Sequence, residues 1–217
     1  MKNIFYISIF LLFVNMDCHK NKCAKEYFFD VPCTHSLLSD TISIGDTIWV
    51  TSNFGPQLLD SKTGEVCTFN SIDFLSFLIF SDISGTKPRY VNEKFNLINV
   101  VGSATLNYYS NDTNYTLGKG GSYSINYEGT SNYNLKLGFI AKERGLYTVS
   151  YGFPRLDRRM NVVETECNGD IYILGAMNNK DTAVNNFHLT SYSSNSYYKS
   201  ISVSEFQKDG KFCFVVE

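Results

Sequence analysis

Cysteine and histidine are the residue types in this chain that can serve as nucleophiles, bases or metal ligands. The cysteines are at positions 18, 23, 33, 67, 167 and 213, and the histidines are at 19, 35 and 188. A nucleophilic site needs a thiol or hydroxyl beside a histidine base that a third group orients. Cys33-Thr34-His35 brings two such groups close together, but it lies among turn residues. We therefore predict no catalytic residue and interpret this pair as a disulfide cysteine beside a surface histidine.

Two further motifs fail as ligand sites. Cys18-His19 with Cys23 resembles a metal-binding cluster, but no Cys-x-x-Cys pair accompanies it. Gly118-Lys119-Gly120-Gly121-Ser122 invites comparison with a phosphate-binding loop, yet Thr113 and Gly120 occupy the positions that require Gly and Ser or Thr. We predict a glycine-rich hairpin there, and neither a metal nor a cofactor.

Carboxylates offer the remaining route to catalysis, since glycosidases use two of them across the scissile bond. The candidates that could meet in space are Asp60, Glu65, Asp73, Glu143, Asp157, Glu164 and Glu166. The charged run from Arg155 to Arg159 is interpreted as a solvated loop with local ion pairs, and an anion site there is the alternative.

Residues 107–134 have a composition suited to binding, because tyrosines alternate with asparagines. Aromatic faces and amide hydrogen bonds are used in the recognition of sugars and peptides. The candidate ligand-binding residues are Tyr108, Tyr109, Tyr123 and Tyr127, with a protein or glycan as the ligand. The alternative is that these are exposed hairpins whose composition reflects a general enrichment of Asn and Tyr.

The preferred disulfide joins Cys167, in a turn before a strand, to Cys213 in the last strand, and the second pairing joins Cys33 to Cys67. The first would close a loop of about 45 residues, worth roughly 3 to 4 kcal/mol in the loop-entropy model.

The N-terminus carries an export signal, in which Lys2 precedes an apolar run from Ile4 to Val14. A membrane-spanning helix needs about 20 apolar residues, so this run is too short for a stable anchor. Cys18 follows and is the predicted lipid-attachment residue, which would tether an exported protein to the membrane of the cell envelope. Ordinary secretory cleavage, a retained anchor and a disulfide at Cys18 are the alternatives. We predict a signal peptide over residues 1–17, a tether over 18–34 and one domain over 35–217.

The chain has 19 basic and 21 acidic residues, for a net charge of −2. A nucleic-acid-binding protein is expected to show a basic face, so nucleic acid is not predicted as a partner.

Short strands dominate the hydrophobic pattern. Alternating apolar residues predict strands with one buried face over residues 41–50, 135–141 and 147–153, and the continuous run from Phe74 to Phe80 predicts a strand covered on both sides. Further strands are expected near residues 95–97, 123–127, 171–174 and 212–216. The best helix candidate is Val203 to Lys208, with Ser202 or Ser204 as N-cap and Asp209-Gly210 as the stop.

Two segments favour an immunoglobulin-like arrangement. Gly45-Asp46-Thr47-Ile48-Trp49-Val50 resembles a B strand, and Glu143 to Val149 resembles the corner before an F strand, where a tyrosine, here Tyr147, bonds back to the chain. Simple core packing is the alternative for Tyr147. About 100 residues separate the two segments, and Val149 stands where antibody domains have cysteine. The predicted fold is therefore an all-β, elaborated immunoglobulin-like β-sandwich with little helix.

The lipoprotein-like start, the segment Asp40 to Val50, the Gly145-Leu146-Tyr147 corner and the ending Lys208 to Glu217 together resemble uncharacterised cell-envelope lipoproteins of Bacteroidota. This resemblance implies an envelope location and no assigned activity. We expect a non-catalytic envelope lipoprotein with a binding or structural role, and a secreted, carboxylate-based hydrolase is the alternative.

Overall fold

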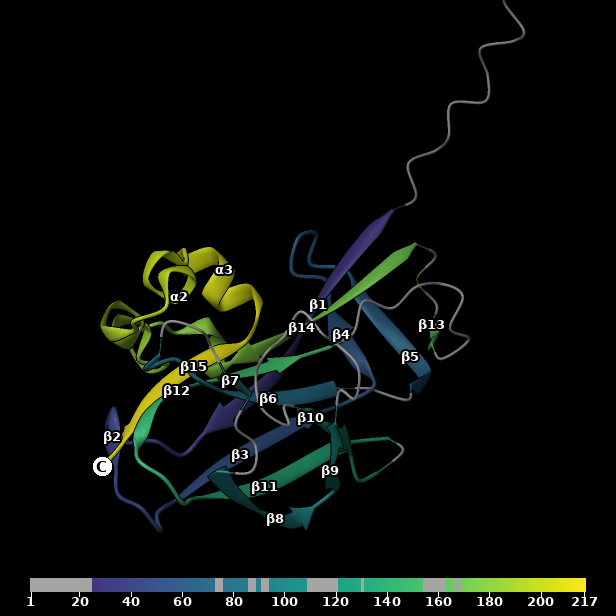
Figure 1. Ribbon diagram of the computed structural model, residues 1–217. Coiled ribbons are helices and arrows are strands. Elements are labelled where there is room, and N and C mark those ends of the chain that lie inside the picture. Colours follow the sequence, from purple (N-terminus) through teal and green to yellow (C-terminus); the bar gives the residue numbers. More distant parts are fainter. Residues whose placement is uncertain are drawn as a thin grey trace, which may run out of the picture.

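The computed structural model describes residues 25–72, 76–85, 89–90, 94–108, 121–129, 131–153, 163–165, 167 and 169–217 (Figure 1). Strands dominate this part of the chain. In order, its elements are β1 (Glu26–His35), β2 (Thr41–Ile42), β3 (Thr47–Phe54), β4 (Gln57–Leu59), β5 (Val66–Ile72), β6 (Ser76–Asp82), β7 (Arg89–Tyr90), β8 (Phe95–Val101), β9 (Ser103–Tyr108), β10 (Gly121–Asn126), β11 (Tyr133–Ala141), β12 (Gly145–Gly152), β13 (Val163–Thr165), β14 (Asp170–Met177), η2 (Asn178–Lys180), η3 (Phe187–Tyr192), α2 (Ser196–Ser200), α3 (Val203–Lys208) and β15 (Lys211–Val216).

Two large sheets form the sandwich. The first has the strand order β14-β1-β3-β11-β8, and the path of the second is β2-β15-β12-β6-β10-β9. Within them, β1-β3-β11-β8 reproduces the order A-B-E-D of an immunoglobulin domain, and β15-β12-β6 reproduces G-F-C. The predicted all-β, immunoglobulin-like sandwich is confirmed, with parallel strands β14 and β2 added to the two sheets.

Aromatic side chains fill the space between the two sheets. Phe80 of the second sheet lies with its ring centroid 4.7 Å from that of Phe139 in the first, and 4.5 Å from that of Phe95. The predicted inward residues of β11, Leu135, Leu137, Phe139 and Ala141, are all buried. The prediction of one strand with a buried face over residues 41–50 is only partly correct. The chain turns between β2 and β3, and this turn leaves Ile44 49% exposed.

The corner before β12 has the predicted geometry. The Tyr147 hydroxyl donates to the carbonyl oxygens of Glu143 and Arg144, at 3.0 and 3.1 Å, while its ring is fully buried. Gly145 is required beside it, since a Cβ there would lie 2.8 Å from the Tyr147 ring. Tyr147 therefore fixes the turn between β11 and β12 as well as packing in the core, and burial raises the pKa of its hydroxyl.

Cysteine pairing differs from both predictions. The disulfide joins Cys67 in β5 to Cys167, just before β14, with their Cα atoms 5.7 Å apart. The predicted bonds Cys167–Cys213 and Cys33–Cys67 are wrong, because Cys33 and Cys213 are free and buried. Cys33 lies between the large sheets, whereas Cys213 faces a second hydrophobic cluster.

The disulfide holds a small third sheet, β13-β5-β4, which we call the flap. Asp60, in the turn between β4 and β5, attaches the flap to β1 by accepting a 2.6 Å hydrogen bond from the Phe28 N–H. Burial of this carboxyl opposes its ionisation, but hydrogen bonds from Thr63 and Phe28 outweigh that effect and lower its pKa.

Residues 178–210 form a helical cap over the outer side of β15 (Figure 1). Phe206 and Leu189 of the cap pack with Cys213 in the second hydrophobic cluster. The predicted helix Val203–Lys208 is confirmed, and Ser202 caps it by accepting from the Glu205 N–H. No helix of the described residues is long and apolar enough to cross a membrane.

The predicted tether over residues 18–34 is wrong in its C-terminal part. Glu26–His35 is strand β1, whose residues Tyr27, Phe29 and Val31 are buried. The signal segment and Cys18 lie outside the described residues.

Candidate binding site

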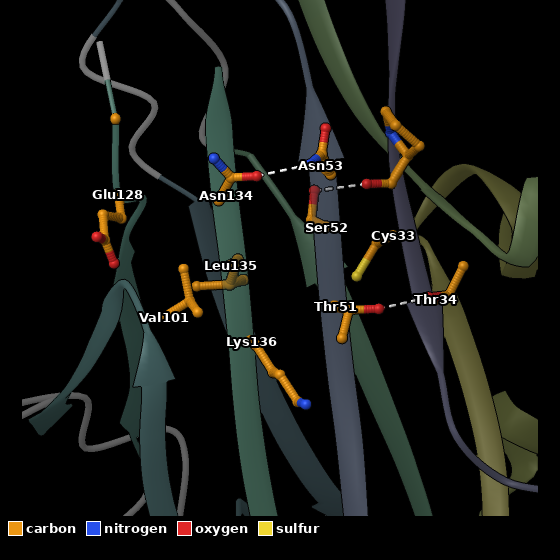
Figure 2. A pocket seen from close by; sticks show the side chains of 12 residues that line it. Cys33, Thr34, Thr51, Ser52, Asn53, Val101, Glu128, Asn134, Leu135 and Lys136 are labelled. Atoms are coloured by element: carbon orange, nitrogen blue, oxygen red, sulfur yellow. Dashed lines mark hydrogen bonds between the residues drawn. The ribbon is translucent and has the colours of Figure 1, made fainter. Parts of the chain in front are cut away.

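A groove with a volume of about 650 Å³ lies across the first sheet (Figure 2). It is lined by Pro32, Cys33, Thr34, Thr51, Ser52, Asn53, Val101, Glu128, Gly129, Asn134, Leu135 and Lys136. Most of these side chains come from β1, β3 and β11, so the groove is built on three neighbouring strands of the first sheet.

The groove opens where β1 leaves β3. Their ladder includes only the pairs Thr34–Thr51 and His35–Val50, and beyond these β1 pairs with β14 instead. Pro32 has no N–H with which to continue the ladder. The Ser52 hydroxyl donates to the Pro32 carbonyl oxygen at 2.6 Å, which satisfies this acceptor where the strands separate.

On its other side, the groove ends where β8 leaves β11. The register shifts between Lys136 and Leu137, so Val101 of β8 lies opposite Lys136. Further along, Glu128 and Asn134 exchange backbone hydrogen bonds of 2.9 Å. The Glu128 carboxylate accepts from the Gly102 N–H at 3.4 Å, which places it at this margin of the groove.

Polar side chains on the floor of the groove are paired across the strands (Figure 2). The hydroxyls of Thr34 and Thr51 lie 2.7 Å apart, and the Asn53 amide donates to the Asn134 side-chain oxygen at 2.6 Å. These pairs favour one arrangement of the side chains in the free protein, which would reduce the entropy lost on binding a ligand. Each pair retains further donors and acceptors for a ligand.

The single tryptophan lies next to the groove on the same outer face. Trp49 covers Gly138 of the adjacent strand, where a Cβ would lie 2.7 Å from its ring. The ammonium group of Lys136 is 5.2 Å from the Trp49 ring centroid. Lys136 forms no ion pair with any residue of the described part of the chain, so its charge remains available to a ligand.

The predicted ligand-binding tyrosines do not form this site. Tyr123 is 3% exposed and packs between the sheets, and Tyr127 turns its hydroxyl inward to Tyr151 and Ser76. The prediction is wrong for these two residues, because alternation along β10 directs Tyr123 and Ile125 into the core. The Tyr108 side chain and all of Tyr109 lie outside the described residues.

Cys33 and His35 share the inner face of β1, as the strand periodicity predicts, and burial disfavours the charged form of each side chain. Burial raises the pKa of the Cys33 thiol far above its usual value and lowers that of His35 to about 4. The imidazole packs on Phe212, with 4.4 Å between ring centroids. His35 is therefore half-buried, contrary to the predicted surface position, and Cys33 is a free thiol.

Of the carboxylates considered for hydrolysis, the three whose side chains the structure describes do not line the groove. Asp60 and Glu65 belong to the flap, and Glu143 pairs with Lys94 at 3.1 Å beside the tyrosine corner. The side chains of Asp73, Asp157, Glu164 and Glu166 lie outside the described residues. Glu128 is thus the one carboxylate among the described residues that line the groove. Nor does the described part of the chain contain a group of three potential metal ligands among His, Cys, Asp and Glu.

Sequence reasoning missed the groove, although the signal was present. The alternation that assigns Leu135 and Leu137 to the core also assigns Asn134 and Lys136 to the opposite face. The same holds for Thr51 and Asn53 on β3. The adjacency of these strands was the missing information.

A scan against protein-family models gives no match, and a sequence search of curated proteins also gives none. Among solved structures, the second type II cohesin module of the ScaA scaffoldin of Acetivibrio cellulolyticus is similar over 71% of this chain and 94% of its own, with 10% identity and a TM-score of 0.27. The type II cohesin dyad of the same scaffoldin is similar over 68% of this chain and 46% of its own, with 11% identity and a TM-score of 0.29. At TM-scores this low, neither the function of the cohesin modules nor the roles of their residues can be assigned to this chain.

Proposed function

We propose that this protein is a non-catalytic binding module whose groove holds a segment of another protein. The observation that carries the proposal is the row of hydrogen-bonded polar side chains on the outer face of β1, β3 and β11, beside the cation of Lys136, which forms no ion pair within the described part of the chain. Fixed hydrogen-bonding groups on rigid strands are suited to recognition.

The lining of the groove favours a protein over a glycan. Sugar recognition uses the face of an aromatic ring, and none of the described residues that line the groove is aromatic. Trp49 lies beside the groove with one face against Gly138. Threonine, asparagine and lysine side chains over an open groove can bind the main chain and an acidic side chain of an extended polypeptide.

Charge reversal in the groove tests this proposal. The full-length chain would be used to capture proteins from an envelope extract, in parallel with Lys136→Glu and with the control Lys199→Glu, an equal charge change on the exposed side of α2. We expect a captured protein that is retained by Lys199→Glu and lost with Lys136→Glu. Equal capture by both variants, or binding to a glycan array without a protein partner, would contradict the proposal.

We also propose that the module works at the cell envelope, held to the membrane by acyl chains on Cys18. Supporting this are the short apolar run after Lys2 and the position of Cys18 behind it. Labelled palmitate should be incorporated into the parent chain and not into Cys18→Ala, which should move from the membrane to the soluble fraction. If Cys18→Ala fractionates like the parent, the tether is wrong.

A further inference from the structure

Strand β8 is an edge strand whose first five residues, Phe95 to Asn99, lack the usual protection against pairing, because the bulge of this strand lies beyond them at Val100. Within the described part of the chain it pairs only with β11, and it lies at the rim of the first sheet (Figure 1). Natural edge strands are commonly blocked by charged side chains or proline. The seven residues of β8, Phe95-Asn96-Leu97-Ile98-Asn99-Val100-Val101, contain neither, and Val100 is 50% exposed.

The backbone groups that face the open edge follow from the hydrogen-bond pattern. The Lys142 N–H donates to the Lys94 carbonyl oxygen at 2.9 Å. On the other side of β11, the Ala141 N–H donates to the Asp46 carbonyl oxygen and the Ala141 carbonyl oxygen accepts from the Gly45 N–H, in the turn just before β3. In an antiparallel pair, every second residue of a strand exchanges backbone hydrogen bonds with its partner strand. Because Lys94 bonds to Lys142, Asn96 and Ile98 also bond to β11. The N–H and C=O groups of Phe95, Leu97 and Asn99 therefore face outward.

We infer that β8 pairs antiparallel with β8 of a second copy of this chain, around a two-fold axis at Leu97. This register opposes Leu97 to Leu97 and Phe95 to Asn99, which joins the outward-facing backbone groups of one copy to those of the other. No charged residue lies within β8, so the self-paired strand brings no like charges together. The two five-stranded sheets then form one continuous sheet, with an isologous interface.

The occupant is a second copy because the edge is self-complementary. On the outer face, the register places the Ile98 side chain of one copy beside Asn96 of the other, and these residues form a non-hydrogen-bonded pair. Their Cα atoms would lie about 4.5 Å apart, within the range that a disulfide can span. The paired residues Phe95 to Asn99 do not line the groove, although Val101 at the end of β8 does, so the inference does not depend on the proposed function.

Cysteine cross-linking tests the register. Asn96→Cys and Ile98→Cys chains mixed in equal amounts should form a covalent dimer on mild oxidation. Each variant alone should not form it above the level of the parent chain, because Asn96 does not face Asn96. Cross-linking that is equal in the mixture and in the separate variants would overturn the register.

Light scattering of the full-length chain over a concentration series tests the association itself. The parent should reach the mass of a dimer, and Ile98→Lys should weaken self-association at least about tenfold by placing a charge on the edge. The control Thr47→Lys places the same charge on the same face of the inner strand β3 and should dimerise like the parent. A parent that stays monomeric, or an Ile98→Lys chain with an unchanged thermal melt that still dimerises, would overturn the inference.

Discussion

At the scale of single residues, Gly138 determines where the only tryptophan lies. A Cβ at this position would come within 2.7 Å of the Trp49 ring, so Gly138→Ala must displace the ring from β11. We expect this overpacking to cost about 1 to 3 kcal/mol of stability. Trp49 is the only tryptophan in the chain, so its fluorescence emission should shift to the red as the ring becomes solvated.

The matched control is Gly55→Ala, where the nearest atom to the added Cβ is the Asn132 side-chain oxygen at 3.8 Å. This variant should retain both the emission maximum and the stability of the parent. Unchanged emission from Gly138→Ala would show that the ring does not rest on β11.

His35 makes the stability of the folded chain depend on pH in the acid range. Its pKa is lowered to about 4 in the folded chain by burial, against 6.5 for an exposed histidine. As the pH falls from 6.5 toward 4, the unfolded chain binds a proton that the folded chain does not. Stability present above pH 6.5 is therefore lost across this window, by up to about 3 kcal/mol.

Urea unfolding at a series of pH values measures this loss. His35→Gln should have a flatter profile between pH 6.5 and 4 than the parent. In the control His188→Gln, His35 is still present, so the acid-dependent loss should remain. An equally steep profile in His35→Gln would assign the loss to other groups.

At the scale of elements, the Cys67–Cys167 disulfide connects the flap to the chain that enters β14. The bond spans a sequence separation of 100 residues, and the loop-entropy model gives about 4 to 5 kcal/mol for a loop of this length. Replacing both cysteines with alanine should therefore lower the melting temperature more than replacing the buried, unpaired Cys213 alone.

Peptide mapping without reduction measures the pairing directly. One cross-linked peptide should contain Cys67 and Cys167, whereas Cys33 and Cys213 should react with a thiol reagent only after unfolding. A peptide that links Cys167 to Cys213 would show that the sequence-based pairing was correct after all.

The elements also show how far sequence reasoning extends. Apolar alternation identified the inward face of β11, because a strand with one face against the core buries every second side chain. It could not pair the cysteines, since disulfide partners are set by which strands become neighbours. It missed η2, where Asn178, Asn179 and Lys180 all have positive φ, because no hydrophobic period marks a left-handed turn.

At the scale of the whole molecule, self-pairing through β8 would leave a pattern in the exchange of amide hydrogens. The N–H groups of Phe95, Leu97 and Asn99 face solvent in a single copy and become hydrogen-bonded in the pair, whereas those of Asn96 and Ile98 bond to β11 in both states. Raising the protein concentration should therefore slow exchange at the first three residues and leave it unchanged at the other two.

Residue-resolved exchange by NMR, measured in parent and Ile98→Lys chains at low and high concentration, would show this alternation. Because a two-fold axis perpendicular to the sheet keeps both outer faces on one side, the pair would present two grooves to the same surface and could bind a clustered partner with avidity. Slow exchange at all five residues in the dilute parent would mean that another segment already covers the edge. The two grooves would then act as separate, monovalent sites.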